Sequence, residues 1–134
     1  MPEENFGYLT VNVFTAGGAL PIEGAMITIK TEDGENSDVV AVLYTDRAGV
    51  SGKIRLPAPP SSNADTPDGG VPYTFYNIDT DKAGYYSTYN IFVPIYSNVT
   101  AIQPVELIPI ARRDDGTVYP YDMTRYNEGF VPNL

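Results

Sequence analysis

The feature that most constrains this chain is a series of short segments in which apolar and polar residues alternate. Within Tyr8–Phe14, Leu9, Val11 and Val13 alternate with polar neighbours, and a period of two gives a strand with one buried face. Glycines and prolines, twelve of each, fall mostly between such segments, as is typical of an all-β protein with many turns. The pattern predicts an antiparallel Greek-key sandwich of about seven strands.

The other expected strands follow at short intervals: Ala25–Lys30, Val39–Thr45, Lys53–Leu56, Tyr73–Thr80, Ile91–Ile95 and Val105–Leu107. Val39–Thr45 is a continuous run of mostly β-branched residues and is predicted to be a more fully buried strand. Tyr73 and Phe75 are out of phase with Tyr76 and Ile78, so we expect a β-bulge near Asn77. The predicted core residues are Leu9, Val11, Val13, Ile27, Ile29, Val42, Ile54, Leu56, Ile78, Val93, Val105 and Leu107.

Composition excludes several classes of function. The chain has no histidine and no cysteine, which removes serine and cysteine triads, ordinary zinc sites and disulfides. Eight basic against seventeen acidic residues give a net charge of -9, which would repel nucleic acids and anionic membranes. No apolar run approaches the ~20 residues of a membrane-spanning helix. We therefore expect a protein that is not an enzyme, has no cofactor and spans no membrane.

Three motifs resemble the carboxypeptidase regulatory-like group of transthyretin-like (prealbumin-like) β-sandwiches. They are Pro21-Ile22-Glu23-Gly24-Ala25, Thr45-Asp46-Arg47-Ala48-Gly49 and Lys82-Ala83-Gly84-Tyr85. The resemblance covers roughly residues 7–110 and implies the fold. It specifies function poorly, and the histidines required by the enzymes of this superfamily are missing here. The first strand also lacks the lysine, and Val105–Ile110 the asparagine, of the crosslink found in collagen-adhesin B-type domains.

Further segments are similar to domains of clostridial spore-cortex-lytic and peptidoglycan-binding proteins: Leu56–Pro59, Tyr76–Ile78, Val93–Tyr96 and Gln103–Leu107. This likeness implies a Gram-positive cell-surface or spore-surface setting. Met1–Asn5 lacks the basic and apolar regions of a signal peptide. We therefore expect an extracellular protein that is exported by another route or whose signal has been removed.

Carboxylates are the main remaining candidates for site chemistry. Asp79 and Asp81 are two residues apart at a strand end and could share a face and bind a cation such as Ca²⁺. The alternative is a solvated strand edge beside Lys82. A second group of acidic residues has the same two interpretations, a weak cation site or the cap of a turn: Asp46, Asp65, Asp68, Asp114 and Asp115.

Tyrosines crowd the segment between residues 73 and 96. Exposed tyrosines can stack on sugar rings or on partner proteins, and we expect Tyr86, Tyr89 and Tyr96 to be the binding candidates. The alternative is cross-strand aromatic pairing, which is the expectation for Tyr73, Tyr76 and Tyr85.

The sequence divides into an N-terminal arm (1–6), the sandwich (7–110) and an aromatic C-terminal tail (111–134). The tail residues Tyr119, Tyr121, Tyr126 and Phe130 would be costly to leave in water. One interpretation is that residues 117–131 and the arm lie against a neighbouring subunit, so that the chain is a building block of a surface assembly. The other is that the tail covers its own sheet. The alternative function is a wall- or spore-associated module that presents tyrosines to a glycan such as peptidoglycan, or to a protein.

Overall fold

The computed structural model describes residues 5–32, 37–60 and 70–126. A single turn of 3-10 helix, η1 (Ala16–Gly18), follows the first strand. The strands are β1 (Phe6–Thr15), β2 (Leu20–Pro21), β3 (Met26–Thr31), β4 (Val39–Tyr44), β5 (Ile54–Pro57), β6 (Tyr73–Asp81), β7 (Thr88–Tyr96), β8 (Thr100–Glu106) and β9 (Thr124–Tyr126).

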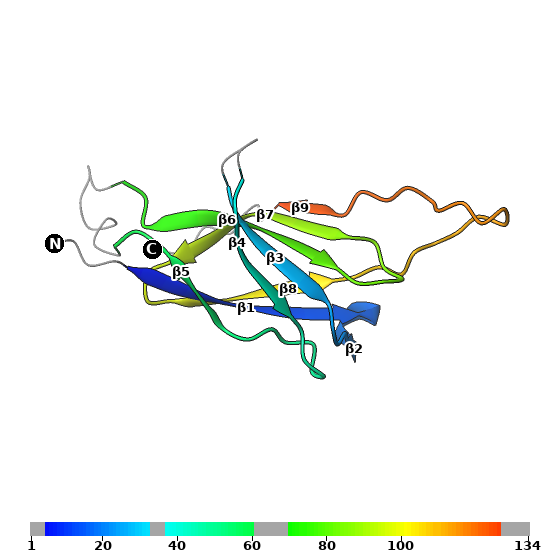
Figure 1. The fold of residues 1–134 in the computed structure, drawn as a ribbon, viewed down its shortest axis with the longest axis horizontal. Helices are drawn as coiled ribbons and strands as arrows, with labels where there is room; N and C mark the ends of the chain where they lie inside the picture. The colour runs from blue at the N-terminus through cyan, green and yellow to red at the C-terminus, as the bar shows by residue number, and fades with distance from the viewer. Residues whose placement is uncertain (1–4, 33–36, 61–69, 127–134) are drawn as a thin grey trace.

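Two sheets face each other, and the predicted all-β sandwich is confirmed (Figure 1). In the first, sheet A, β1 pairs with β8 along one side and with β5 and β2 along the other. The second, sheet B, has the order β4-β3-β6-β7-β9. The pairs β1–β8 and β7–β9 are parallel, so the sheets are mixed and not wholly antiparallel.

The core lies between the inner faces of the two sheets. On β1 the buried and partly buried residues alternate without interruption, as the period of two predicts. All predicted core residues are buried except Ile54, which packs against the core while partly exposed, and Val42. The core also contains residues that are not among the predicted core residues: Ile22, Ala25, Ala58, Tyr76 and Ile95.

The prediction of a fully buried strand at Val39–Thr45 is wrong for most of that segment. β4 lies at the edge of sheet B, and its Val42 is 48% exposed. Only Ala41 and Leu43 pack against the core. A continuous run of apolar side chains would suit a strand that is covered on both faces. β4 is an edge strand with one neighbour, and sheet A covers its inner face but not its outer face.

Two of the sequence motifs meet at the side chain of Thr45. Its buried hydroxyl donates to the Ile22 carbonyl at 2.6 Å and accepts from the Ala25 N–H at 2.9 Å. The next residue, Asp46, caps the following turn by accepting from the N–H groups of Ala48 and Val50 at 2.9 and 3.0 Å. The predicted turn-capping role of Asp46 is thereby confirmed, and the two motifs act as one clamp at this end of the sandwich.

A β-bulge interrupts the pairing of β6 with β7, as predicted near Asn77. The register shifts between Tyr76 and Ile78. The extra residue belongs to β7, where Phe92 has a φ of 59° and its N–H donates to the Asn77 side-chain oxygen at 3.2 Å. The bulge turns the ring of Phe92 to the outer face, where it lies 5.5 Å from the ring of Phe75.

Candidate functional site

The segment between β8 and β9 forms a hairpin that projects beyond the sandwich (Figure 1). We call residues 111–121 the hairpin arm. Its two sides are held by an isolated bridge between Arg112 and Val118, and its tip is closed by a hydrogen bond of 2.9 Å from the Gly116 N–H to the Arg113 carbonyl. Asp115 accepts from both the N–H and the hydroxyl of Thr117, and these bonds lower the pKa of its carboxyl group. The carboxylate therefore stabilises the turn of the arm.

Tyr86 fixes the base of the arm to the sandwich. Its hydroxyl donates to the Tyr119 carbonyl at 2.7 Å and accepts from the Ala111 N–H at 3.1 Å. Its ring lies 5.5 Å from that of Tyr121. Tyr86, which the sequence offers as a binding residue, is thus engaged with the chain's own arm.

The arm exposes apolar side chains to solvent. Val118, Tyr119 and Tyr121 are 40%, 47% and 55% exposed. The guanidinium of Arg113 stacks over the ring of Tyr119, 4.8 Å from its centroid. Such a fixed, protruding aromatic surface suits contact with another macromolecule.

After the arm, the chain returns to its own sheet. Met123 is buried, the Tyr89 N–H donates to its carbonyl at 3.1 Å, and β9 pairs in parallel with β7 as far as the register of Tyr126 with Ile91. In this stretch the tail lies against its own sheet, which is the intramolecular alternative. The assembly candidate Phe130 and residues 1–4 of the N-terminal arm lie outside the described residues.

Aromatic rings gather on the outer face of β6 and β7. Tyr73 is 4.8 Å from Phe75 and 5.5 Å from Tyr96, and Phe75 is 5.5 Å from Phe92. We call these four residues the aromatic cluster. Burial and the neighbouring Tyr73 raise the pKa of Tyr96. Of the predicted binding tyrosines, Tyr96 alone belongs to the cluster.

The other tyrosines have separate positions. Tyr89 is 42% exposed on β7 and lies opposite Asp79 in the register. Tyr85 is partly buried and packs against the core. Tyr76 is buried and bridges the two sheets, because its hydroxyl donates to the Pro57 carbonyl at 2.6 Å. Burial raises the pKa of this hydroxyl, which keeps it protonated as a donor.

The paired carboxylates of β6 are engaged by neighbouring side chains. Asp79 forms a salt bridge of 2.5 Å with Lys30, and this bond raises the pKa of the lysine. Asp81 accepts a hydrogen bond from the Ser87 hydroxyl. Within the described residues, no group of three or more acidic side chains could hold a metal ion. Asp65 and Asp68 lie outside the described residues.

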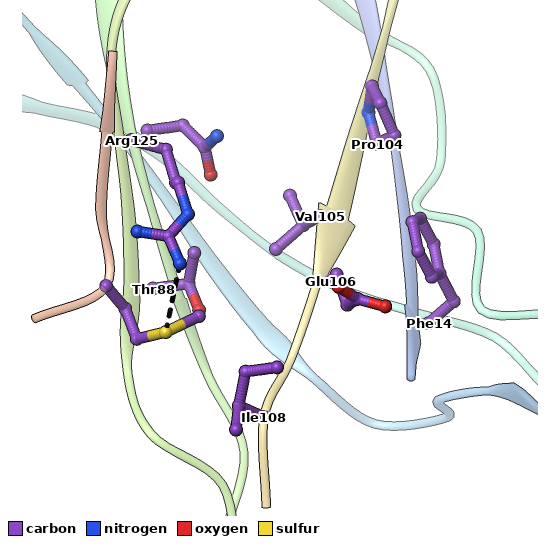
Figure 2. A pocket seen from close by; sticks show the side chains of 9 residues that line it. Phe14, Thr88, Pro104, Val105, Glu106, Ile108 and Arg125 are labelled. Atoms are coloured by element: carbon purple, nitrogen blue, oxygen red, sulfur yellow. Dashed lines mark hydrogen bonds between the residues drawn. The ribbon is translucent and has the colours of Figure 1, made fainter. Parts of the chain in front are cut away.

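A cleft of about 270 Å³ opens between the sheets, beside β8 (Figure 2). Sheet A ends at β8 on this side while sheet B continues through β7 to β9, so part of the inner face of sheet B is left uncovered. In Figure 2, Thr88 and Arg125 face Val105 across the opening. The full lining is Phe14, Thr88, Asn90, Pro104, Val105, Glu106, Ile108, Met123 and Arg125.

The cleft is lined by hydrogen-bonding groups and by one carboxylate, that of Glu106. Among the described residues, the Thr88 hydroxyl and the Asn90 side-chain oxygen have no protein hydrogen-bond partner. Glu106 accepts from the Gly17 N–H at 2.9 Å, and Arg125 donates to the Thr124 carbonyl at 3.2 Å. A glycosidase would need two carboxyl groups about 5–10 Å apart, whereas Glu106 is the single carboxylate in this lining.

The sequence signals for these surfaces were partial. Tyr73 and Phe75 are spaced by two on one strand, which places both rings on one face, so half of the aromatic cluster could have been found. Phe92 joins it only through the bulge. The cleft depends on which strands end each sheet, for which the sequence has no local signal.

No protein-family model matches this sequence, and no curated protein matches it. Solved structures do resemble the fold. The minor pilin GBS52 of Streptococcus agalactiae has 16% identity and a TM-score of 0.55, over 89% of this chain and 49% of the pilin. A DUF3823 family protein from Parabacteroides merdae has 13% identity and a TM-score of 0.53, over 81% of this chain and 48% of the other. A mutant of the shaft pilin SpaA from Lactobacillus rhamnosus GG has 12% identity and a TM-score of 0.51, over 88% and 59%.

These likenesses define the class: a two-sheet β-sandwich of the kind found as a domain in pilins. At these identities the likeness is one of fold. The chain spans 49%, 48% and 59% of the three solved chains. The part of the chain that the structure describes contains no helix that is long and apolar enough to cross a bilayer.

Proposed function

We propose that this chain is a non-catalytic structural module of a bacterial surface assembly and that its hairpin arm joins it to a neighbouring copy or surface protein. The observation that carries the proposal is the exposed apolar surface of the arm, with Tyr119 and Tyr121 held in place by Tyr86. Fixing an aromatic surface before contact lowers the entropy lost on association. The pilin-like fold and the lack of histidine and cysteine support a structural role.

Replacing both Tyr119 and Tyr121 by serine is expected to weaken self-association at least about tenfold, which corresponds to about 1.4 kcal/mol. The substitutions remove exposed apolar area and leave the backbone bonds that close the arm. Sedimentation velocity and negative-stain microscopy over a concentration series would measure the effect. We prefer substitution to deletion of residues 111–134, because deletion also removes β9 and buried Met123.

Leu20→Ser is a matched control, since Leu20 is 57% exposed on the short strand β2. It should associate like the natural chain. Association of the double variant at the natural strength would reject the role of the arm. Antibody labelling of intact bacterial cells or spores tests the surface location, and labelling that requires permeabilised cells would reject it.

A second candidate function is favoured by the aromatic cluster: a binding module that presents tyrosines to cell-wall glycan. Aromatic stacking contributes about 0.5–1.5 kcal/mol beyond area burial. Tyr96→Ala should therefore weaken binding to peptidoglycan fragments roughly tenfold in a calorimetric titration. Tyr44→Ala removes an exposed tyrosine from β4 and is the control. Failure of the natural chain to bind the fragments would reject this function and leave the structural proposal intact.

A further inference from the structure

The cleft beside β8 has a floor that is built from two neighbouring strands of sheet B. Asn90 of β7 is paired with Arg125 of β9 in a parallel register, so their side chains project from the same face of the sheet. Thr88 and Met123, each two residues earlier in the chain, also line the cleft. Side chains from one patch of sheet B therefore face the space that sheet A leaves open.

Two polar oxygens of this floor lack a partner. Thr88 and Asn90 are 2% and 5% exposed, and within the described residues the Thr88 hydroxyl and the Asn90 side-chain oxygen accept or donate no hydrogen bond. A buried polar group without a partner costs free energy, so each such group in a folded protein needs an explanation. The Asn90 oxygen can only accept, whereas the Thr88 hydroxyl can accept or donate. A molecule that completes this floor must supply a hydrogen-bond donor.

The guanidinium of Arg125 lies along the same floor. Its Nη2 donates to the Met123 sulfur at 3.4 Å and its Nη1 to the Thr124 carbonyl at 3.2 Å. In Figure 2 the guanidinium lies beside Thr88. Both of its hydrogen-bond partners are uncharged, and a guanidinium has five N–H donors, so donors remain for a ligand.

The positive charge of Arg125 has no counter-charge in the cleft. Among the described residues it takes part in no salt bridge. The carboxylate of the lining, Glu106, instead accepts from the Gly17 N–H at 2.9 Å. In a chain with seventeen acidic and eight basic residues, a cation left without a carboxylate indicates that the carboxylate comes from a ligand, which the planar guanidinium binds through two parallel hydrogen bonds.

The rest of the lining is largely aliphatic, and the space is small. Val105 and Met123 are buried, and Ile108 lies next to them along the opening. Ligand pockets usually measure about 300–1,000 Å³. A cleft of about 270 Å³ therefore suits a molecule the size of one or two amino-acid residues with an apolar side chain.

We propose that the cleft binds an N-acylated α-amino carboxylate with an aliphatic side chain, which is the chemistry of the C-terminal residue of a peptide. The carboxylate accepts from the Arg125 guanidinium and the Thr88 hydroxyl, and the ligand N–H donates to the Asn90 oxygen. The aliphatic side chain packs against Val105 and Met123. An inorganic anion has no N–H for Asn90, and an uncharged sugar supplies no counter-charge for Arg125.

This site is independent of the proposed function. The hairpin arm, residues 111–121, contributes nothing to the lining of the cleft. Failure of the arm to join copies therefore leaves ligand binding intact, and a cleft that binds nothing leaves the role of the arm intact.

A titration of the full chain with N-acetyl-leucine, followed by two-dimensional NMR, tests the ligand chemistry. Addition should shift the backbone signals of Thr88, Asn90 and Arg125. N-acetyl-leucinamide lacks the carboxylate and the O-acetyl ester of the matching hydroxy acid lacks the N–H, so each should bind at least about tenfold more weakly. A tripeptide that ends in leucine distinguishes the sources: tighter binding than N-acetyl-leucine assigns the cleft to a peptide terminus, and weaker binding assigns it to a free acylated amino acid.

Two variants test the residues. Thr88→Val and Arg125→Gln should each weaken the binding of N-acetyl-leucine at least about tenfold. Arg47→Gln is the matched control, because it makes the same change of charge at an exposed turn residue outside the cleft, and it should bind like the natural chain. Thr88→Val should leave the midpoint of thermal unfolding unchanged or raise it, since a methyl group replaces a hydroxyl that has no partner.

Three results would overturn the inference. The first is a natural chain whose spectrum does not change with N-acetyl-leucine. The second is binding of equal strength by the Arg125→Gln variant. The third is a cleft that responds to inorganic phosphate or to N-acetylglucosamine and not to the acylated amino acid, which would assign it to an anion or to a sugar.

Discussion

Gly7→Ala is expected to lower the free energy of unfolding by about 3 kcal/mol, at the upper end of the usual range for overpacking. A methyl group on Gly7 would overlap the Tyr96 carbonyl oxygen and lie 2.5 Å from Cγ2 of Ile95. Both neighbours belong to β7, a paired strand of sheet B. Because a backbone carbonyl cannot rotate away as a side chain can, the two sheets would have to separate at this end.

Denaturant unfolding of the variant gives the measurement, and Gly52→Ala provides the comparison. A methyl group on Gly52 would have no atom within 4 Å, and the residue has no positive φ, so its replacement should change the unfolding free energy by less than about 0.5 kcal/mol. Equal effects at the two positions would show that the close approach of β1 to β7 is not as the structure has it.

Gly49→Ala is expected to destabilise the chain by about 3 kcal/mol for two reasons. Gly49 has a φ of 77°, a left-handed conformation that costs an L-residue about 1–2 kcal/mol. A methyl group would also overlap the Val13 carbonyl oxygen and lie 3.0 Å from Cβ of Pro21. The clamp that joins the first two sequence motifs would then be displaced from β1.

Gly84→Ala separates the two causes. Gly84 has a φ of 90° but no atom within 4 Å of the added methyl group, so it should show the conformational cost alone. We expect the midpoint of thermal unfolding to fall further for Gly49→Ala than for Gly84→Ala. A reversed order would mean that the overlap at Gly49 is relieved without cost.

Local pattern was sufficient to predict the strands that have one buried face. β1 shows this most clearly, since every second residue from Gly7 to Thr15 is buried. A bulge occurs near Asn77 as predicted, but the apolar phase of Tyr73–Ile78 is not its cause: from Phe75 onward β6 alternates regularly between outward and buried residues, and the extra residue lies on β7. For β1 the information lies within a short stretch of sequence.

The features that sequence reasoning missed depend on distant neighbours. The run at β4 fits a buried strand, and nothing in Val39–Tyr44 tells how many strands flank it. The parallel pairing of β1 with β8 joins residues far apart in the chain, such as Tyr8 with Thr100, and its direction follows from the path of the chain between the sheets. The sequence predicts an aromatic tail and leaves open whether it lies against its own sheet or a neighbouring subunit. Its return to β7 depends on buried Met123 and a three-residue ladder.

A stretching force applied to the ends of this fold would load two elements in succession. A pull between Phe6 and Tyr126 acts first on β9, which has a short ladder. Once β9 detaches and the hydrogen bonds of Gly84 and Tyr86 to residues 108–119 break, the stretch from Glu106 to Tyr126 can straighten, with a contour of roughly 70 Å at about 3.5 Å per residue. The force then reaches β1 and β8 at opposite ends of a parallel ladder that runs from Tyr8 to Phe14, so its hydrogen bonds are loaded in shear and bear the force together. In single-molecule pulling, a low-force extension should therefore precede the rupture of the sandwich.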